Sequence, residues 1–201
     1  MHMGTLFYLM GASGVGKDSL LHYLRSRLPA SAPVRLPRRY ITRPADNGGE
    51  VHIEISPEAF QLKLERDEFA LHWQSHGFHY GIDREIDHWL AQGLQVVVNG
   101  SRHYLETARQ TYPTLQPILV SVSRETLRRR LLARGREDAA AIERRLQRGE
   151  ELDNLANHQP FHRLGNEGPL IEAGEALLRL VYPDIDSVPF SKSGRGVWGR
   201  L

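Results

Sequence analysis

The chain has 201 residues, contains no cysteine and carries a formal net charge of only +2 at pH 7. The length suits one α/β domain with a sizeable core, and the lack of cysteine excludes disulfide bonds and thiolate metal sites. No apolar run approaches a membrane span and no signal peptide precedes the first apolar segment, so we expect a soluble, cytoplasmic protein that acts away from membranes.

The first predicted elements surround a glycine-rich loop. Residues Thr5–Met10 form an apolar run that predicts a strand, and Lys17–Leu28 carries apolar residues at helical spacing. The loop and the start of the helix read Gly11, Ala12, Ser13, Gly14, Val15, Gly16, Lys17, Asp18 and Ser19. Glycines let successive N–H groups turn toward phosphate oxygens, the helix N-terminus adds positive potential, and the lysine adds a charge for the β- and γ-phosphates. This order indicates a P-loop that binds a nucleoside triphosphate.

One position departs from the P-loop pattern. Asp18 stands where serine or threonine normally offers a hydroxyl to magnesium. Its carboxylate is a good hard-oxygen ligand, so it could bind Mg²⁺ directly or through water. Alternatively, it repels the phosphates and either pairs with an arginine or caps the helix. We expect Ser19 to offer its hydroxyl to the α-phosphate.

Residues 29–82 combine loops, short strands and a hairpin. The predicted elements are, in order, a proline-rich loop over 29–37, a polar turn over 46–49, a half-buried strand over 51–55, a helix that begins at Ser56 and Pro57, and a hairpin of Phe69–Trp73 with Phe78–Tyr80. The basic run 38–43 supplies a second anion site, to which Tyr80 adds a phenolic hydroxyl. We assign Trp73 and Trp89 to the core.

Residues 83–183 alternate between helices and apolar strands. The predicted elements are helices over 83–92, 102–110, 124–133, 139–155 and 169–181, and strands over 94–98, 117–122 and 161–164. This alternation predicts a parallel sheet flanked by helices. Residues 184–201 have loop composition, which predicts a flexible tail.

Arginine is concentrated in one part of the chain. Between Arg124 and Arg148 there are nine arginines against four acidic residues. Arg130 and Arg134 share one helix face, Gly135 allows a sharp change of direction into Arg136, and Arg145 lies on the next helix. A solvated helical face would explain such a run, but an arginine-edged lid that closes over a triphosphate fits the P-loop better. Aromatic residues are not interleaved with the run, so we expect no nucleic-acid partner.

The P-loop, Thr42-Arg43, Tyr80-Gly81 and the arginine series resemble guanylate kinase in order and spacing over about residues 5 to 180. The resemblance implies a P-loop NTPase fold in a single domain, 1–183, with an acceptor-binding region near 34–82 and a lid near 124–148. It also implies phosphoryl transfer from ATP to a phosphate. By position, Arg43 and Tyr80 would hold the acceptor phosphate. The catalytic residues would be Lys17, Arg130, Arg134 and Arg145.

Several positions differ from guanylate kinase where that family binds GMP. A base-reading glutamate is replaced by Leu71 and a second phosphate-binding arginine by Asp46. A tyrosine is replaced by His52 and a small hydroxyl residue by Arg39. Asn99-Gly100-Ser101 replaces Asp-x-Asp. Without the base-reading carboxylate the hydrogen-bond donors of guanine have no acceptor, so we do not expect GMP to be the substrate.

The same substitutions resemble ribose 1,5-bisphosphate phosphokinases, a family related to guanylate kinase that acts in phosphonate catabolism. The matching strings are Gly11–Leu21, Arg39–Arg43, Val98–Arg102 and Arg134–Glu137. The resemblance implies that ATP and Mg²⁺ convert ribose 1,5-bisphosphate into 5-phosphoribosyl diphosphate. Because this acceptor has no base and two phosphates, Arg39 and His52 would be useful additions, and we expect Asn99 and Ser101 to line the ribose pocket.

Two other functions remain open from the sequence. One is a nucleoside monophosphate kinase with altered base choice. The other is a guanylate-kinase-like binding module without catalysis, against which Gly16-Lys17 and the three lid arginines argue, because a pure binding module does not need them. The sequence leaves the oligomeric state open, with a homodimer among the options.

Overall fold

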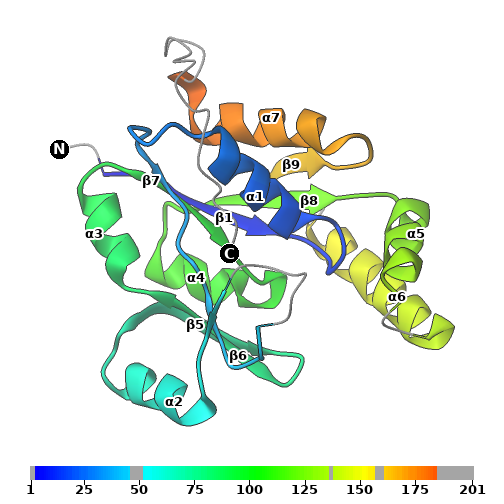
Figure 1. The fold of residues 1–201 in the computed structure, drawn as a ribbon, viewed down its shortest axis with the longest axis horizontal. Coiled ribbons are helices and arrows are strands. Elements are labelled where there is room, and N and C mark those ends of the chain that lie inside the picture. Colours follow the sequence, from blue (N-terminus) through cyan, green and yellow to red (C-terminus); the bar gives the residue numbers. More distant parts are fainter. Residues whose placement is uncertain (1–2, 46–51, 136–137, 157–160, 185–201) are drawn as a thin grey trace, which may run out of the picture.

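The computed structural model describes residues 3–45, 52–135, 138–156 and 161–184 (Figure 1). Its larger sheet has the strand order β2-β7-β1-β8-β9 and is parallel throughout, as predicted. The strands are β1 Leu6–Met10, β2 Val34–Arg35, β7 Gln95–Asn99, β8 Gln116–Ser121 and β9 His162–Gly165. The predicted turn over 46–49 and the tail beyond residue 184 lie outside the described residues.

The core lies on both faces of this sheet. Alternate residues of β1 separate into two clusters, with Phe7 and Leu9 in one and Leu6, Tyr8 and Met10 in the other, because successive side chains of a strand point to opposite faces. Helices α1 (Lys17–Arg27) and α7 (Leu170–Val181) cover the first face (Figure 1). Helices α3 (Glu85–Ala91) and α4 (Leu105–Thr111) contribute to the second cluster. The helix predicted over 102–110 begins with a 3₁₀ turn, η1 (Arg102–Tyr104).

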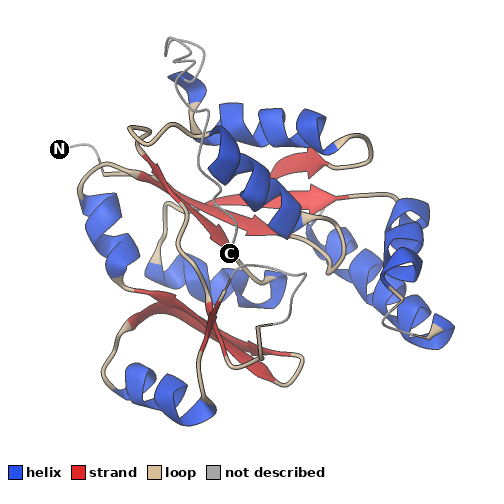
Figure 2. Ribbon diagram, in the orientation of Figure 1, coloured by secondary structure: helices blue, strands red, loops and turns tan. Residues whose placement is uncertain are grey.

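A smaller sheet is inserted between β2 and α3. Its strand order is β4-β3-β6-β5, formed by β3 Tyr40–Ile41, β4 Ile53–Glu54, β5 Phe69–Ser75 and β6 Phe78–Asp83. The predicted hairpin is confirmed: β5 and β6 are antiparallel around His76 and Gly77, whose φ angles are 51° and 78°. The predicted cap of α2 (Pro57–Glu65) is also confirmed, because Ser56 Oγ accepts a hydrogen bond from Ala59 N at 3.1 Å. Figure 2 shows this sheet below the parallel one, with α2 on its outer side.

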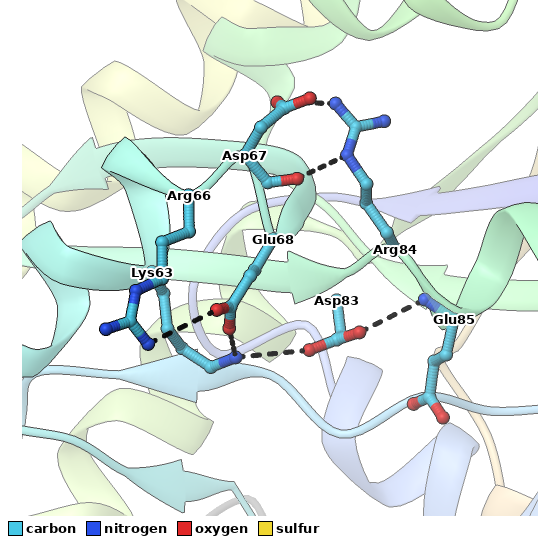
Figure 3. A network of polar contacts seen from close by, with 7 residues as sticks. All are labelled: Lys63, Arg66, Asp67, Glu68, Asp83, Arg84 and Glu85. Atoms are coloured by element: carbon cyan, nitrogen blue, oxygen red, sulfur yellow. Dashed lines mark hydrogen bonds and ion pairs between the residues drawn. The ribbon is translucent and has the colours of Figure 1, made fainter.

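A network of charged side chains ties the ends of these inserted elements together (Figure 3). Lys63 at the end of α2 contacts Glu68 and lies 3.5 Å from Asp83 Oδ2. Arg84 pairs with Asp67 in the turn before β5. The hydrogen bond with Glu68 raises the pKa of Lys63. These contacts hold the start of β5 beside the end of β6, although partly exposed ion pairs of this kind stabilise a fold only modestly.

Two helices extend from the sheet after β8. They are α5 (Arg124–Arg134) and α6 (Ala139–Ala156), which pack against each other at one side of the molecule (Figure 1). Gly135 ends α5 with a φ of 61°, the sharp change of direction that the sequence predicts there. Arg136 lies outside the described residues. Among the described helices, none combines the length and the apolar character that a membrane span requires.

Candidate active site

The P-loop connects β1 to α1. Gly16, the residue before the helix, has a φ of 97°, and a Cβ there would lie 2.5 Å from Asn166 Nδ2. Both the backbone conformation and the space therefore require glycine. Lys17 Nζ donates hydrogen bonds to the carbonyl oxygens of Gly11 at 2.9 Å and Ala12 at 3.1 Å. The ammonium group is thus held against the loop that the sequence assigns to phosphates.

A cavity of about 650 Å³ opens beside this loop. It runs between the P-loop, the smaller sheet, the Asn99-Gly100-Ser101 turn and α6. The residues predicted to act in the site that line it are Gly11, Ala12, Ser13, Gly14, Gly16, Lys17, Asp18, Ser19, Arg39, Arg43, Tyr80, Asn99, Ser101 and Arg145. Val15, His52 and Arg130 are described but do not line it. The side chain of Arg134 lies outside the described part of the structure.

Asp18 contacts an amide group and not an arginine. Asn99 Nδ2 donates a hydrogen bond to Asp18 Oδ1 at 2.8 Å. Asn99 ends β7 and is 4% exposed, whereas the Asp18 side chain is exposed. Asp18 lies in the first turn of α1, whose N-cap is Gly16. Within the described residues, neither the arginine pairing nor the capping position considered from the sequence is found.

A buried tyrosine holds the turn that follows β7. The Tyr8 hydroxyl accepts a hydrogen bond from Ser101 N at 2.9 Å and lies 3.0 Å from the Ser101 carbonyl oxygen, to which it donates. A Cβ at Gly100 would lie 2.1 Å from Tyr8 Cζ, so only glycine lets the turn pass the ring. Burial raises the pKa of Tyr8 well above its usual value. Tyr8 was not among the predicted site residues, because its position in an apolar strand suggests a packing role.

Arg43 lines the cavity. Its Nε is buried and has no hydrogen-bond partner among the described residues. His52 is 8% exposed, and its Nε2 lies 3.1 Å from the carbonyl oxygen of Arg43. The structure therefore places His52 against the main chain of Arg43, where it can fix that segment, and not at the cavity surface where we expected it.

Two stacked aromatic rings lie at the cavity. Trp73 stacks on Tyr80 with ring centroids 5.5 Å apart and an interplanar angle of 2°. Arg39 lies over the Tyr80 ring at 5.2 Å, and its Nη1 donates to the Asn99 carbonyl oxygen at 3.4 Å. Trp73 is buried as predicted, but it also lines the cavity. The prediction that it belongs to the core was therefore incomplete.

The described arginines that we predicted to form a lid occupy two different environments. Arg145 lines the cavity, together with its neighbour Arg144. Arg130 instead donates from Nη1 to the Val15 carbonyl oxygen at 3.2 Å and from Nη2 to the Asn166 carbonyl oxygen at 2.7 Å. Asn166 Nδ2 donates to the same Val15 oxygen at 2.7 Å. Arg130 and Asn166 thus tie α5 and the turn after β9 to the P-loop backbone.

Several cavity residues were absent from the predicted site, among them Arg102, His103 and Arg144. Arg102 donates from Nη1 to the Gly149 carbonyl oxygen at 3.2 Å, which links η1 to α6. Its place directly after Asn99-Gly100-Ser101 was the available signal. Arg144 precedes Arg145 on the same helix. Because successive residues of a helix point in different directions, the prediction for Arg145 did not extend to Arg144.

A scan against protein-family models found no match. A protein from Desulfomicrobium baculatum, named ribose 1,5-bisphosphate phosphokinase PhnN, is 54% identical over 179 residues, which are 89% of this chain and 95% of that protein. A protein of the same name from Thiobacillus denitrificans is 47% identical over 181 residues, 90% of this chain and 94% of its own. The solved guanylate kinase of Anaplasma phagocytophilum shares the fold, with a TM-score of 0.66, 16% identity, and coverage of 90% of this chain and 85% of that one.

The parallel sheet, the P-loop and the inserted smaller sheet define a P-loop fold of the guanylate kinase type. The identities over nine-tenths of the chain specify the group further. The chain belongs to the ribose 1,5-bisphosphate phosphokinase family.

Proposed function

We propose that the protein transfers the γ-phosphoryl group of ATP to the 1-phosphate of ribose 1,5-bisphosphate, giving 5-phosphoribosyl 1-diphosphate and ADP. The charge of the cavity wall carries this proposal. Its described lining contains one carboxylate, that of Asp18, against six fixed cations: Lys17, Arg39, Arg43, Arg102, Arg144 and Arg145. Such a wall suits a triphosphate together with an acceptor that carries two phosphate groups.

The same wall is poorly suited to a nucleobase. Leu71, at the position of the base-reading glutamate, is 0% exposed and does not line the cavity, whereas the stacked rings of Trp73 and Tyr80 do. Asn99 and Ser101 stand where guanylate kinases carry two carboxylates. A guanine placed here would lose water from its N–H donors without gaining charged acceptors, which is a severe penalty for selection. The acceptor we propose has no base and incurs no such penalty.

We assign roles to the cavity residues accordingly. The P-loop amides, Lys17 and Ser19 would bind the triphosphate. Arg43 and Tyr80, which both line the cavity, would hold the phosphate that accepts the γ-phosphoryl group. The family resemblance adds Arg134 to the triphosphate side, and Arg130 would act through the P-loop backbone that it contacts.

The residues at the start of α1 also fit a magnesium ion. Asp18 and Ser19 both line the cavity and offer a carboxylate and a hydroxyl, the hard oxygen donors that Mg²⁺ prefers. When bound with ATP, Mg²⁺ would neutralise charge on the β- and γ-phosphates.

The transfer requires positioning more than proton chemistry. An oxygen of the 1-phosphate attacks the γ-phosphorus, while the bond from that phosphorus to the β,γ-bridging oxygen breaks and ADP leaves with the electron pair. Because the attacking oxygen is already ionised at neutral pH, no general base is needed. Arg145 and Lys17 would stabilise the charge spread over the transferred group.

Phosphorus NMR tests the proposal. The protein is incubated with ATP, Mg²⁺ and either ribose 1,5-bisphosphate or GMP, and the products are followed by their ³¹P signals. We expect a diphosphate signal on ribose C1 and no GDP. Formation of GDP without the ribose diphosphate would favour a nucleoside monophosphate kinase, and no transfer to either acceptor would favour a binding module.

A further inference from the structure

The contact between Asp18 and Asn99 joins two positions that serve one purpose in P-loop kinases. In these enzymes a neutral hydroxyl residue follows the P-loop lysine, and an acidic residue at the end of a neighbouring strand completes the magnesium site. Here the acidic residue follows Lys17, and the neutral residue ends β7. Strand β7 lies beside β1, with Leu9 opposite Asn99. Asp18 and Asn99 therefore lie next to each other, and both line the cavity.

The geometry of the pair gives each side chain a separate task. The Asp18 carboxylate can only accept hydrogen bonds, so the Asn99 amide nitrogen faces it, at 2.8 Å from Oδ1. Asn99 is 4% exposed, and its Oδ1 is buried with no partner among the described residues. The asparagine is therefore held by the core, whereas Asp18 is exposed at the cavity surface. A fixed donor of this kind orients the exposed carboxylate.

We propose that the acidic and neutral positions of the magnesium site have exchanged places in this protein, with Asp18 carrying the charge and Asn99 acting as the residue that positions it. Oδ1 of Asp18 is bound by Asn99, and its other oxygen is available to the metal or to a metal-bound water. A second carboxylate at position 99 would face Asp18 across a hydrogen-bond distance and repel it, which explains why an amide stands there. The inference rests on the ATP binding in the proposed function but not on the identity of the acceptor.

Binding of Mn²⁺ tests the inference without catalysis. Free Mn²⁺ is measured by electron paramagnetic resonance in the presence of the protein and a non-hydrolysable ATP analogue, with no acceptor present. Asp18→Asn keeps the shape and removes the charge, and we expect it to weaken Mn²⁺ binding by roughly 10-fold or more. Glu65→Gln, which removes an exposed carboxylate of α2, is the matched control and should leave Mn²⁺ binding unchanged.

Exchanging the two residues gives the sharper test. Asp18→Ser should weaken Mn²⁺ binding as Asp18→Asn does, and the double variant Asp18→Ser/Asn99→Asp should restore it to within about threefold of the unaltered protein, since each position then has its usual chemistry. Asn99→Ala should weaken Mn²⁺ binding while Asp18 is still present, because the carboxylate loses its fixed donor. Circular dichroism identifies any variant that fails to fold. If the variants at buried Asn99 do not fold, the result for the exposed Asp18→Asn change decides the question.

Unchanged Mn²⁺ affinity in Asp18→Asn would overturn the inference, and so would a folded double variant that binds no better than Asp18→Ser. Both results leave the proposed function standing, because the analogue would still bind and ribose 1,5-bisphosphate could still be phosphorylated. Failure of the unaltered protein to bind the ATP analogue would refute the proposed function and this inference together.

Discussion

Replacing Tyr8 by phenylalanine removes one oxygen atom that holds the turn after β7. The Tyr8 side chain is 0% exposed, and its hydroxyl is bonded to both the N–H and the carbonyl oxygen of Ser101, at 2.9 Å and 3.0 Å. The ring keeps its volume and its contact with Gly100, so no large cavity forms. The substitution therefore costs two hydrogen bonds, and the N–H and the carbonyl oxygen of Ser101 stay in place without this partner.

The expected cost follows from those two bonds. At about 1 kcal/mol each, plus a share of the penalty for main-chain groups left without a partner, Tyr8→Phe should destabilise the fold by about 2 to 3 kcal/mol. For a domain of this size that corresponds to a fall in melting temperature of roughly 4 to 12 °C. The looser turn carries Asn99 and Ser101, so we also expect a higher KM for the acceptor.

Thermal unfolding followed by circular dichroism measures the first effect, and steady-state kinetics the second. Tyr182→Phe is the matched control, because Tyr182 is half-buried and its hydroxyl has no hydrogen bond to the described residues. It should change stability by less than about 0.5 kcal/mol. If Tyr8→Phe melts with the control and keeps the acceptor KM, the role given to this hydroxyl is wrong.

Three further predictions concern the same cavity. Burial raises the pKa of Tyr8, so the folded state keeps this proton at pH values above the unfolded pKa of about 10. The free energy of unfolding, measured in urea, should therefore fall as pH rises above that value, and more steeply than in Tyr8→Phe. The same dependence on pH in both proteins would contradict this. Asn166→Ala removes one of the two donors to the Val15 carbonyl oxygen, so it should lower the free energy of unfolding by about 2 kcal/mol and weaken the binding of an ATP analogue measured by calorimetry. Unchanged affinity for the analogue would show that this hydrogen bond does not shape the P-loop. Arg43→Lys keeps the charge but loses the guanidinium fork, so kcat/KM for the acceptor should fall roughly 10- to 100-fold while the affinity for ATP stays unchanged. An equal loss of ATP affinity would show that Arg43 binds ATP and not the acceptor.

Much of the fold could be predicted because its signals are local. Apolar periodicity located the helices and strands, and glycine or proline located the turns. The Ser56 cap, the hairpin at His76 and Gly77, and the end of α5 at Gly135 were all confirmed. Each depends on residues within a few positions of one another. The two-residue strand β4, shorter than the predicted 51–55, shows where a local pattern extends beyond the actual pairing.

The site was harder to predict because its contacts join distant segments. Asp18 and Asn99 are 81 residues apart and meet only because β1 and β7 are neighbours. His52 was assigned to the substrate by position in a family pattern, but burial and the Arg43 main chain decide where its ring lies. Arg130 belongs to a helix that points at the P-loop, and the spacing of arginines cannot tell a contact with phosphate from a contact with the loop's own carbonyl groups.

A competition between acceptors tests the central claim most directly. Ribose 1,5-bisphosphate and GMP are supplied together at equal concentration with limiting ATP and Mg²⁺, and both products are quantified by ³¹P NMR. A cavity with six fixed cations and a single carboxylate in its described lining should phosphorylate the ribose bisphosphate at least roughly 10³-fold faster. Formation of GDP at a comparable or greater rate would contradict the account.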